Sequence, residues 1–248
     1  MRASWAALSG MLVLGFLAGP AVAQEFSIDL GSGGGEGSLS LRAVQLLLLI
    51  TLLSIVPGLA VMVTCFPFIV TVLSILRQAI GLQQAPPNML IVSLALFLTW
   101  YVMDPVFTQA WVTGIQPMTT GEMEVTPALP AAIHPFRDFM ALRVDPETFQ
   151  SLADLRPATG AATPAVAPLS LLEPSFLLSE IQRAFESGFM IFLPFLIIDL
   201  VVAAILMSLG MMMVPPAVVS MPFKLAFFVV ADGWALVTGA LVRSYLPA

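Results

Sequence analysis

The sequence has very few of the side chains on which most catalytic and metal sites depend. Its 248 residues include one cysteine, Cys65, and one histidine, His134. A single cysteine excludes a disulfide framework, and the two residues together are too few for a His/Cys metal site. No motif for nucleophilic catalysis surrounds the histidine. We therefore predict no catalytic residues, no bound metal and no cofactor.

Charged residues are also scarce, and they are not clustered. Only 10% of the chain is charged, 59% is hydrophobic and the mean hydropathy is +0.99. A soluble domain, by contrast, has about 25% charged residues. The nine basic residues are spread along a chain of net charge −6, so no basic patch is available for nucleic acid. This composition predicts a membrane protein that does not bind nucleic acid.

The N-terminus has the three parts of a secretory signal peptide. Arg2 gives a positive charge, residues 6–18 are mostly apolar, and AVA at 21–23 is a cleavage pattern of small residues. We predict that residues 1–23 are a signal peptide, with an uncleaved first helix as the alternative. Residues 24–42 are rich in glycine and serine, which indicates a flexible exported tail.

Four apolar segments follow, and their order predicts two helical hairpins. Three of them are long enough for the roughly 20 residues that a membrane span needs, while residues 88–103 are short for one. The hairpins are residues 43–103 and residues 188–242, and the loop GMMMVPP at 210–216 interrupts the second. We therefore predict an all-α integral membrane protein.

A polar stretch, residues 104–187, separates the two hairpins. It holds ten acidic residues, four arginines and many prolines, and PATGAATPAVAP at 157–168 is a low-complexity linker inside it. A cleaved signal peptide places the mature N-terminus outside. The stretch is then a periplasmic lobe, and the loops at 64–87 and 210–216 lie on the cytoplasmic side. Residues 243–248 form a short C-terminal tail.

An amphipathic helix is predicted within the loop 64–87. Gly81 marks its end, because glycine is favoured just after the last helical turn. Its apolar residues recur at helical spacing and form one face: Ile69, Val72, Leu73, Leu76 and Ile80. Such a helix either lies flat on the membrane or packs into a protein assembly, and the residues alone leave both open.

Two ionisable residues stand inside the second hairpin, where a charge is costly and usually faces a partner or water. Asp199 lies sixteen residues before a turn at Pro215-Pro216, and Lys224 lies eight after it. At about 1.5 Å per residue, their heights differ by roughly 12 Å. We therefore expect pairing between subunits, or positions that face an aqueous lumen, and no direct pair within one hairpin. The alternative for Lys224 is a side chain that snorkels to the interface.

Helix breakers and methionines both indicate an assembly around a path. Prolines recur in the apolar segments, and broken backbone at membrane depth is tolerated where it is buried in protein or lines a cavity. In GMMMVPP the turn belongs to Pro215 and Pro216, since methionine is a flexible gap-filling residue and no turn former. Met211, Met212 and Met213 therefore either pack at a helix end or contact something that passes them.

Two other classes of function explain less of the sequence. A proton-coupled transporter would use Asp199 and Lys224, but it predicts internal repeats, which we do not find. An intramembrane enzyme would need a catalytic pair inside a span, and the sequence provides no such motif of histidine, cysteine or paired carboxylates.

Three long motifs resemble a known family, the flagellar biosynthetic protein FliP family. They are LSILRQAIGLQQAPPNMLIVSLALFLT at 73–99, FLPFLIIDLVVAAILMSLGMMMVPP at 192–216 and VSMPFKLAFFVVADGWALVTGALV at 219–242. A weaker match, PFRDFM, lies at 135–140. The resemblance covers most of both predicted hairpins and the start of the helix that leads into the second.

The resemblance implies a core subunit of the flagellar type III export gate, which exports unfolded rod, hook and filament proteins. In the family, several copies form a pentamer and assemble with FliQ and FliR into a helical pore. This pore lies in the inner membrane at the base of the basal body, and FlhA and FlhB are expected partners. The family fold is all-helical, and much of it is lifted above the bilayer plane. No enzymatic activity is implied.

The same resemblance assigns roles to individual residues. The three methionines would line the constriction of the pore as an apolar gasket, because unbranched thioethers close on each other and rearrange around a passing chain. A dry apolar ring also resists ions by dewetting. Charged family positions, for which the resemblance implies roles in subunit contacts or in the lumen, are matched at Asp199, Lys224, Glu180 and Arg183. Phe139 belongs to the PFRDFM match.

The sequence departs from the family pattern in two places. Phe68 stands where the family usually has an arginine, so that contact is lost or is replaced by Arg77 and Gln78. The lobe between residues 140 and 172 matches poorly and carries the low-complexity linker. The homologous subunit of a virulence injectisome, which shares the methionine loop, is the alternative function. The signal peptide and the long periplasmic stretch favour the flagellar branch.

Overall fold

The computed structural model describes residues 44–51, 54–55, 58, 61–82, 86–156, 163–211 and 213–245. The chain divides into two compact units, Met1–Leu53 and Ser54–Ala248. In the first unit residues 44–51 are helical, and the second unit carries all elements discussed below. The predicted signal peptide, the exported tail, residues 157–162 of the predicted linker and residues 246–248 lie outside the described residues.

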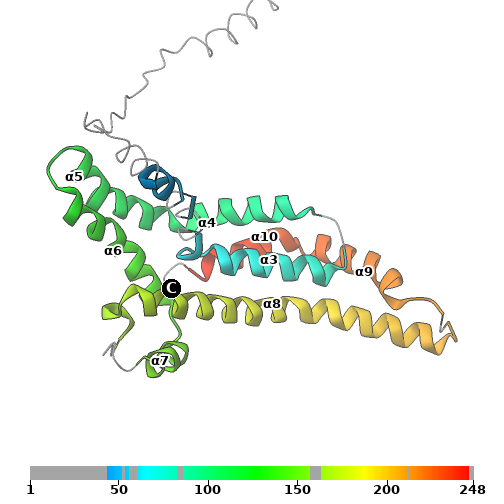
Figure 1. Cartoon of the computed structure of the whole chain (residues 1–248). Helices are drawn as coiled ribbons and strands as arrows, with labels where there is room; N and C mark the ends of the chain where they lie inside the picture. The colour runs from blue at the N-terminus through cyan, green and yellow to red at the C-terminus, as the bar shows by residue number, and fades with distance from the viewer. Residues whose placement is uncertain are drawn as a thin grey trace, which may run out of the picture. The chain divides into compact units, whose positions relative to one another are not determined.

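The prediction of an all-α fold is confirmed: the described residues form helices and contain no strand. Figure 1 shows α3 between α4 and the long α8, with α9 and α10 returning along the same bundle. The α-helices are α3 (Phe66–Ile80), α4 (Asn88–Ala110), α5 (Gln116–Thr119), α6 (Val125–Arg143), α7 (Pro146–Asp154), α8 (Leu169–Ser208), α9 (Pro216–Val230) and α10 (Gly233–Arg243). A π-helical turn, η1 (Trp111–Ile115), follows α4, and a 3-10 turn, η3 (Pro164–Val166), precedes α8.

Helix α3 confirms the amphipathic helix predicted in the loop, including its end. Gly81 adopts φ +87°, a left-handed conformation in which its N–H caps the last turn at the Gln78 carbonyl. The predicted apolar face is buried, and α3 packs against both α4 and α8. Burying such a side chain stabilises a fold by about 1.5–3 kcal/mol. The helix therefore lies in the core of the bundle and not flat on a membrane surface.

Helix α4 extends beyond the apolar segment, residues 88–103, from which it was predicted. It continues through Asp104 and Pro105 into η1 and α5, so that residues 88–119 form one helical run of 32 residues. A proline inside a helix removes one backbone donor and crowds the carbonyl four residues earlier, yet α4 continues past Pro105. The run is apolar enough and long enough to cross a membrane.

Helix α6 folds back along α4 and contacts it most closely at η1 (Figure 1). A Cβ built on Gly114 would lie 2.5 Å from the backbone nitrogen of Ala132, a distance that real side chains do not reach. Thr113 in the same π-turn donates a hydrogen bond to the Ala131 carbonyl, 3.2 Å away. The π-turn therefore places a glycine where the two backbones meet.

Gly114→Ala is expected to lower the stability of the subunit by about 1–3 kcal/mol, since an extra methyl in a tight contact forces the backbone apart. The measurement is the unfolding midpoint of the purified protein in detergent. Gly58→Ala is the matched control, because a Cβ there meets nothing within 4 Å and alanine is the better helix former. Equal midpoints for the two variants would contradict the close approach.

The polar stretch between the hairpins is largely helical. It contains α6, α7, η3 and the first part of α8, which share an apolar cluster comprising Met140, Val144, Phe149, Ala167, Leu171, Leu172 and Phe176. Arg137 holds η3 in place by donating to the carbonyls of Ala167 (2.7 Å) and Ala165 (3.3 Å). These contacts give the stretch a core of its own in spite of its prolines.

Helix α8 runs for 40 residues, or about 60 Å at 1.5 Å per residue. It begins at Leu169, within the predicted lobe, and ends at Ser208, before the methionines. Helices α9 and α10 meet at an angle of 62° and together are long enough to count as one broken span. By length and apolar composition, the described residues thus offer two helices that could cross a membrane, or three with the bent pair.

Candidate functional site

An ion pair inside the second hairpin joins three helices. The Lys224 ammonium on α9 lies 2.6 Å from Oδ2 of Asp199 on α8. Its Nζ also donates to the Ala79 carbonyl on α3, 3.1 Å away, and the Ser220 hydroxyl donates to Oδ1 of Asp199 at 2.6 Å. Lys224 is only 6% exposed. The ammonium is therefore buried and held by two oxygen acceptors.

This geometry corrects the prediction that Asp199 and Lys224 do not pair within one hairpin. The expected 12 Å offset assumed a sharp turn at Pro215-Pro216. The actual connection is longer: α8 ends at Ser208 and α9 begins at Pro216. Asp199 is then nine residues from the end of its helix and Lys224 eight from the start of its own, so both lie at the same height. Since its ammonium is buried, Lys224 does not snorkel.

The position of Lys224 also suits the end of α3. Ala79 lies in the last turn of that helix, whose free carbonyls carry a partial negative charge. A cation there satisfies an orphan acceptor and interacts favourably with the helix dipole. The ion pair therefore fixes the α8–α9 hairpin in register and fastens it to α3.

The methionine loop, residues 209–215, begins where Gly210 ends α8. Gly210 has φ +76°, its N–H donates to the Met207 carbonyl (3.0 Å), and the Met211 N–H donates to the Leu206 carbonyl (2.9 Å). These two bonds form the Schellman motif, which requires a left-handed residue after the helix. The turn is therefore shared: glycine stops α8, and the two prolines start α9.

The two methionine side chains of the loop that the structure describes are exposed to different degrees. Met211 is 44% exposed and Met213 is 97% exposed, while Met212 lies outside the described residues. Exposed methionine on a loop leaves flexible apolar surface without a contact in the single chain. The two described side chains are thus free to meet other molecules.

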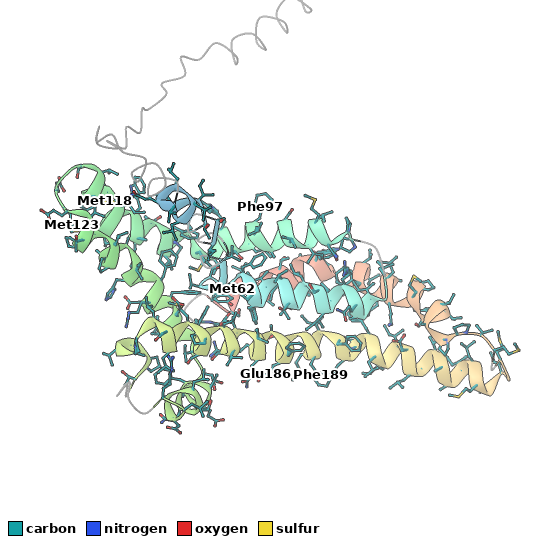
Figure 2. The ribbon with its side chains drawn as sticks, viewed as in Figure 1. Met62, Phe97, Met118, Met123, Glu186 and Phe189 are labelled. Carbon is teal, nitrogen blue, oxygen red and sulfur yellow. The ribbon has the colours of Figure 1, made fainter. Side chains whose placement is uncertain are left out.

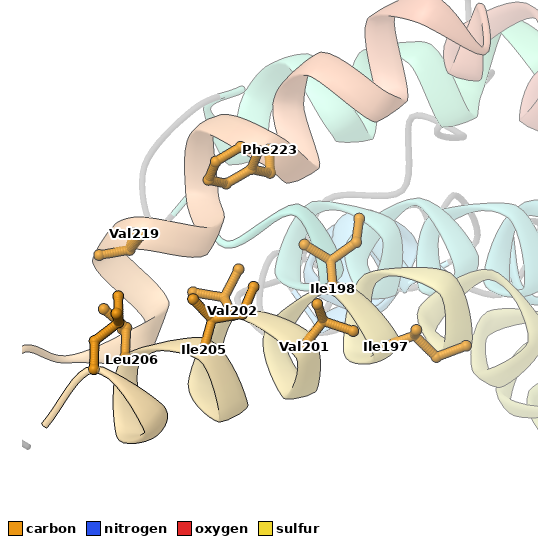
Figure 3. A pocket seen from close by; sticks show the side chains of 9 residues that line it. Ile197, Ile198, Val201, Val202, Ile205, Leu206, Val219 and Phe223 are labelled. Atoms are coloured by element: carbon orange, nitrogen blue, oxygen red, sulfur yellow. The ribbon is translucent and has the colours of Figure 1, made fainter. Parts of the chain in front are cut away.

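Beside the methionine loop, an apolar groove of about 530 Å³ lies between α8 and α9 (Figure 3). Valine, isoleucine, leucine and phenylalanine side chains line it without a charged group, so its surface favours another apolar helix or lipid over water. The lining residues are Ile197, Ile198, Val201, Val202, Ile205, Leu206, Leu209, Val219 and Phe223.

At the other end of the bundle, Glu180 is completely buried within a cluster of polar groups. Its Oε1 lies 3.0 Å from Nε of Arg143 on α6 and 3.4 Å from Nη1 of Arg183 on its own helix. The Tyr245 hydroxyl donates to Oε2. A buried carboxylate needs such partners, because desolvation without them would cost several kcal/mol. Sequence reasoning found Glu180 and Arg183 but missed Arg143 and Tyr245.

Aromatic rings surround this cluster. The Tyr245 ring stacks on Phe139 with centroids 6.1 Å apart and meets the edge of Phe68 at 5.6 Å. The Arg143 guanidinium lies over the tyrosine ring, 4.1 Å from its centroid, which is a favourable cation–π distance. Phe68 is therefore a buried ring in this cluster. Arg77 lies elsewhere and donates to the Asn88 side chain.

Asp145 caps helix α7 from the same region. Its Oδ2 accepts hydrogen bonds from the Thr148 N–H (2.9 Å) and hydroxyl (3.0 Å). Its own N–H donates to Oγ of the buried Ser179 at 2.9 Å. The two bonds from Thr148 favour the ionised carboxylate and hold the pKa of Asp145 below its ordinary value of 3.8.

A lowered folded-state pKa contributes stability above the unfolded value and loses it as the pH falls through the folded value. Asp145→Asn keeps an acceptor oxygen but does not titrate. We expect the wild type to be the more stable at pH 7 and its advantage to vanish as the pH falls below 3.8. The unfolding midpoint between pH 7 and pH 3 measures this, and Thr148→Val should reduce the advantage. A difference independent of pH would contradict the capping role.

The described residues contain no group of three or more histidine, cysteine or acidic side chains that could hold a metal ion. Cys65 is fully buried, and burial raises the pKa of its thiol to about 12. Because the thiolate is the reactive form, this cysteine is a poor nucleophile at neutral pH.

Comparisons with known proteins agree with one another on the family that this chain resembles. The FliP family model matches residues 49–241. The chain is 49% identical to the flagellar biosynthetic protein FliP of Caulobacter vibrioides over 88% of its own length and 81% of the relative. It is 44% identical to that of Agrobacterium fabrum (94% and 96% of the two chains) and 40% identical to that of Bacillus subtilis (82% and 91%).

Proposed function

Since the chain belongs to the FliP family, we propose that it is a core, pore-forming subunit of the flagellar type III export gate. The observation that supports this most is the methionine loop. It lies at the tip of a hairpin that a buried ion pair fastens to α3, and both of its described methionine side chains are exposed. The loop is thus flexible in its side chains and fixed in its position.

Several copies arranged in a ring would bring these loops together around an axis. Apolar thioethers then fill the opening, and the dry constriction excludes water and ions. An unfolded polypeptide passes because methionine side chains change rotamer at little cost. A charged residue at this place would hold water, and a branched one would adapt less. The ring thereby seals against ions and admits extended protein chains.

The surface of the single chain supports an assembly within or beside a membrane. Figure 2 shows Phe97 on α4 and Phe189 on α8 projecting away from the bundle, and they are 75% and 58% exposed. Such patches are covered by lipid or by other subunits. We propose further copies of this chain, FliQ and FliR as neighbours, with FlhA and FlhB nearby, in the inner membrane at the flagellar basal body. The cargo is unfolded rod, hook and filament protein.

Deletion of the gene tests the proposal. We expect cells without flagellar filaments and without hook protein in the medium, and an intact copy of the gene should restore both. Filaments that persist would contradict the flagellar role and would favour the alternative, the homologous subunit of an injectisome, which is assayed by secretion of effector proteins. The relatives reported above are all named as flagellar proteins, which favours the first outcome.

A further inference from the structure

Helix α10, which ends the last hairpin, packs on the bundle through a few apolar side chains: Leu241 and Val237 join the main core, and the Trp234 ring meets the edge of Phe228. Within it only Gly233 and Leu241 are buried. Trp234 and Leu236 are 39% and 57% exposed. Since burial of apolar area is the main source of stability in a packed helix, contacts made just after this short helix add substantially to what holds it.

That contact lies just after the helix, at residues 244–245. The Ser244 carbonyl accepts a hydrogen bond from Nη1 of Arg143, 3.0 Å away. Tyr245 lies between Phe139 and Phe68, beneath the Arg143 guanidinium, and its hydroxyl donates to Glu180. Residues 244–245 are thus held by groups from α3, α6 and α8.

The opposite end of α10 is a tight bend. Asp232 has φ +49° and ψ +47°, a left-handed conformation that residues with a side chain rarely adopt. A Cβ built on Gly233 would lie 2.2 Å from the Phe228 ring, so only glycine permits the bend as it stands. The change of direction between α9 and α10 is therefore concentrated at these two residues.

We propose that Ser244 and Tyr245 form a clasp that locks α10 in its resting position, with the bend at Asp232 as its pivot. Arg143 is central to the clasp because it binds both of its residues, at the Ser244 carbonyl and the Tyr245 ring, and also binds the Glu180 carboxylate. When the clasp opens, α10 loses its main attachment to the lobe and swings about the bend. The consequence for the gate rests on the proposed function, whereas the clasp itself does not.

Hydrogen–deuterium exchange of the purified full-length protein tests the clasp without any secretion assay. Tyr245→Ala is expected to speed exchange of the α10 amides about tenfold or more, because it removes the ring contacts and leaves a buried acceptor of Glu180 unpaired. Tyr245→Phe keeps the ring and should give an intermediate increase. Exchange in the middle of α8, at residues 192–200, should not change, because this segment lies at least twelve residues beyond Glu180 on the same helix. Tyr101→Phe, at an exposed tyrosine on α4, is the matched control.

Arg143→Lys tests whether faster exchange in α10 comes from loss of the clasp or from a general loss of stability. Lysine retains a positive charge near Glu180 but lacks the planar fork that binds the carboxylate, the ring and the carbonyl together. We expect faster exchange in α10 here as well. Unchanged α10 exchange in Tyr245→Ala and Arg143→Lys would overturn the proposal, as would an equal rise in α10 and in residues 192–200 of α8. Loss of filaments upon gene deletion is independent of either result, so the two proposals fail separately.

Discussion

Asp199→Leu is expected to destabilise the folded subunit by about 3 kcal/mol, the lower end of the cost of leaving one partner of a buried ion pair alone, because the Asp199 side chain is 32% exposed. Lys224 is 6% exposed, and its ammonium would keep only the Ala79 carbonyl. Because the pair also joins α8, α9 and α3, the hairpin should lose its register as well as its stability. Thermal unfolding of the protein in detergent measures the change.

A double-mutant cycle tests whether Asp199 and Lys224 stabilise the fold as a coupled pair or independently of each other. Asp199→Leu with Lys224→Met replaces the ions by apolar side chains of similar size, which is often close to neutral in a buried site. The double variant should therefore be more stable than either single one. Asp104→Leu, at an exposed aspartate within α4, is the control for removing an acidic residue from a long apolar helix. Additive single effects would refute the pairing.

The same variants bear on assembly. If the ion pair sets the position of the hairpin, Asp199→Leu should reduce recovery of the multi-subunit complex from detergent, and the double variant should restore part of it. Normal recovery of the complex, combined with impaired export, would instead assign Asp199 to transport through the lumen.

The position of a helix could be predicted from the sequence where a local pattern of residues determines it. The apolar spacing from Ile69 to Ile80 and the glycine at position 81 fixed α3 closely. The start of α4 at Asn88 agreed because Pro87 precedes it. The end of α4 was wrong, since Asp104 and Pro105 look like the end of a helix and are tolerated within one. An aspartate followed by a proline marks the end of a helix only where the helix does not go on packing against its neighbours beyond that point.

Features that depend on distant residues could not be predicted. The offset between Asp199 and Lys224 was wrong because the seven-residue connection between α8 and α9 was read as a sharp turn. Arg143 and Tyr245 lie 37 and 65 positions from Glu180, and no periodicity links them. Glu180 itself was found only by resemblance to the family. Its burial at the meeting point of α6, α8 and the C-terminus is a property of the tertiary fold.

The largest functional effect is expected from the methionine loop. Replacing Met211, Met212 and Met213 by alanine removes most of the apolar volume that would close a ring of loops. We expect membranes that contain the assembled gate to conduct protons or small ions in the resting state, at least tenfold above the wild type. The physical reason is that a wider constriction stays hydrated, and a hydrated pore loses its dewetting barrier. Ion flux in proteoliposomes or whole cells measures the leak.

A second substitution separates sealing from passage. Leucine at the three positions restores apolar volume but has fewer rotatable bonds than methionine, so this variant should remain tight while exporting less hook protein. Met207→Ala is the matched control, because this methionine is 61% exposed but lies within the last turns of α8 and not in the loop. An alanine variant that assembles normally and leaks no more than this control would refute the seal. In that case the exposed methionines would make contacts between subunits and would not close the pore.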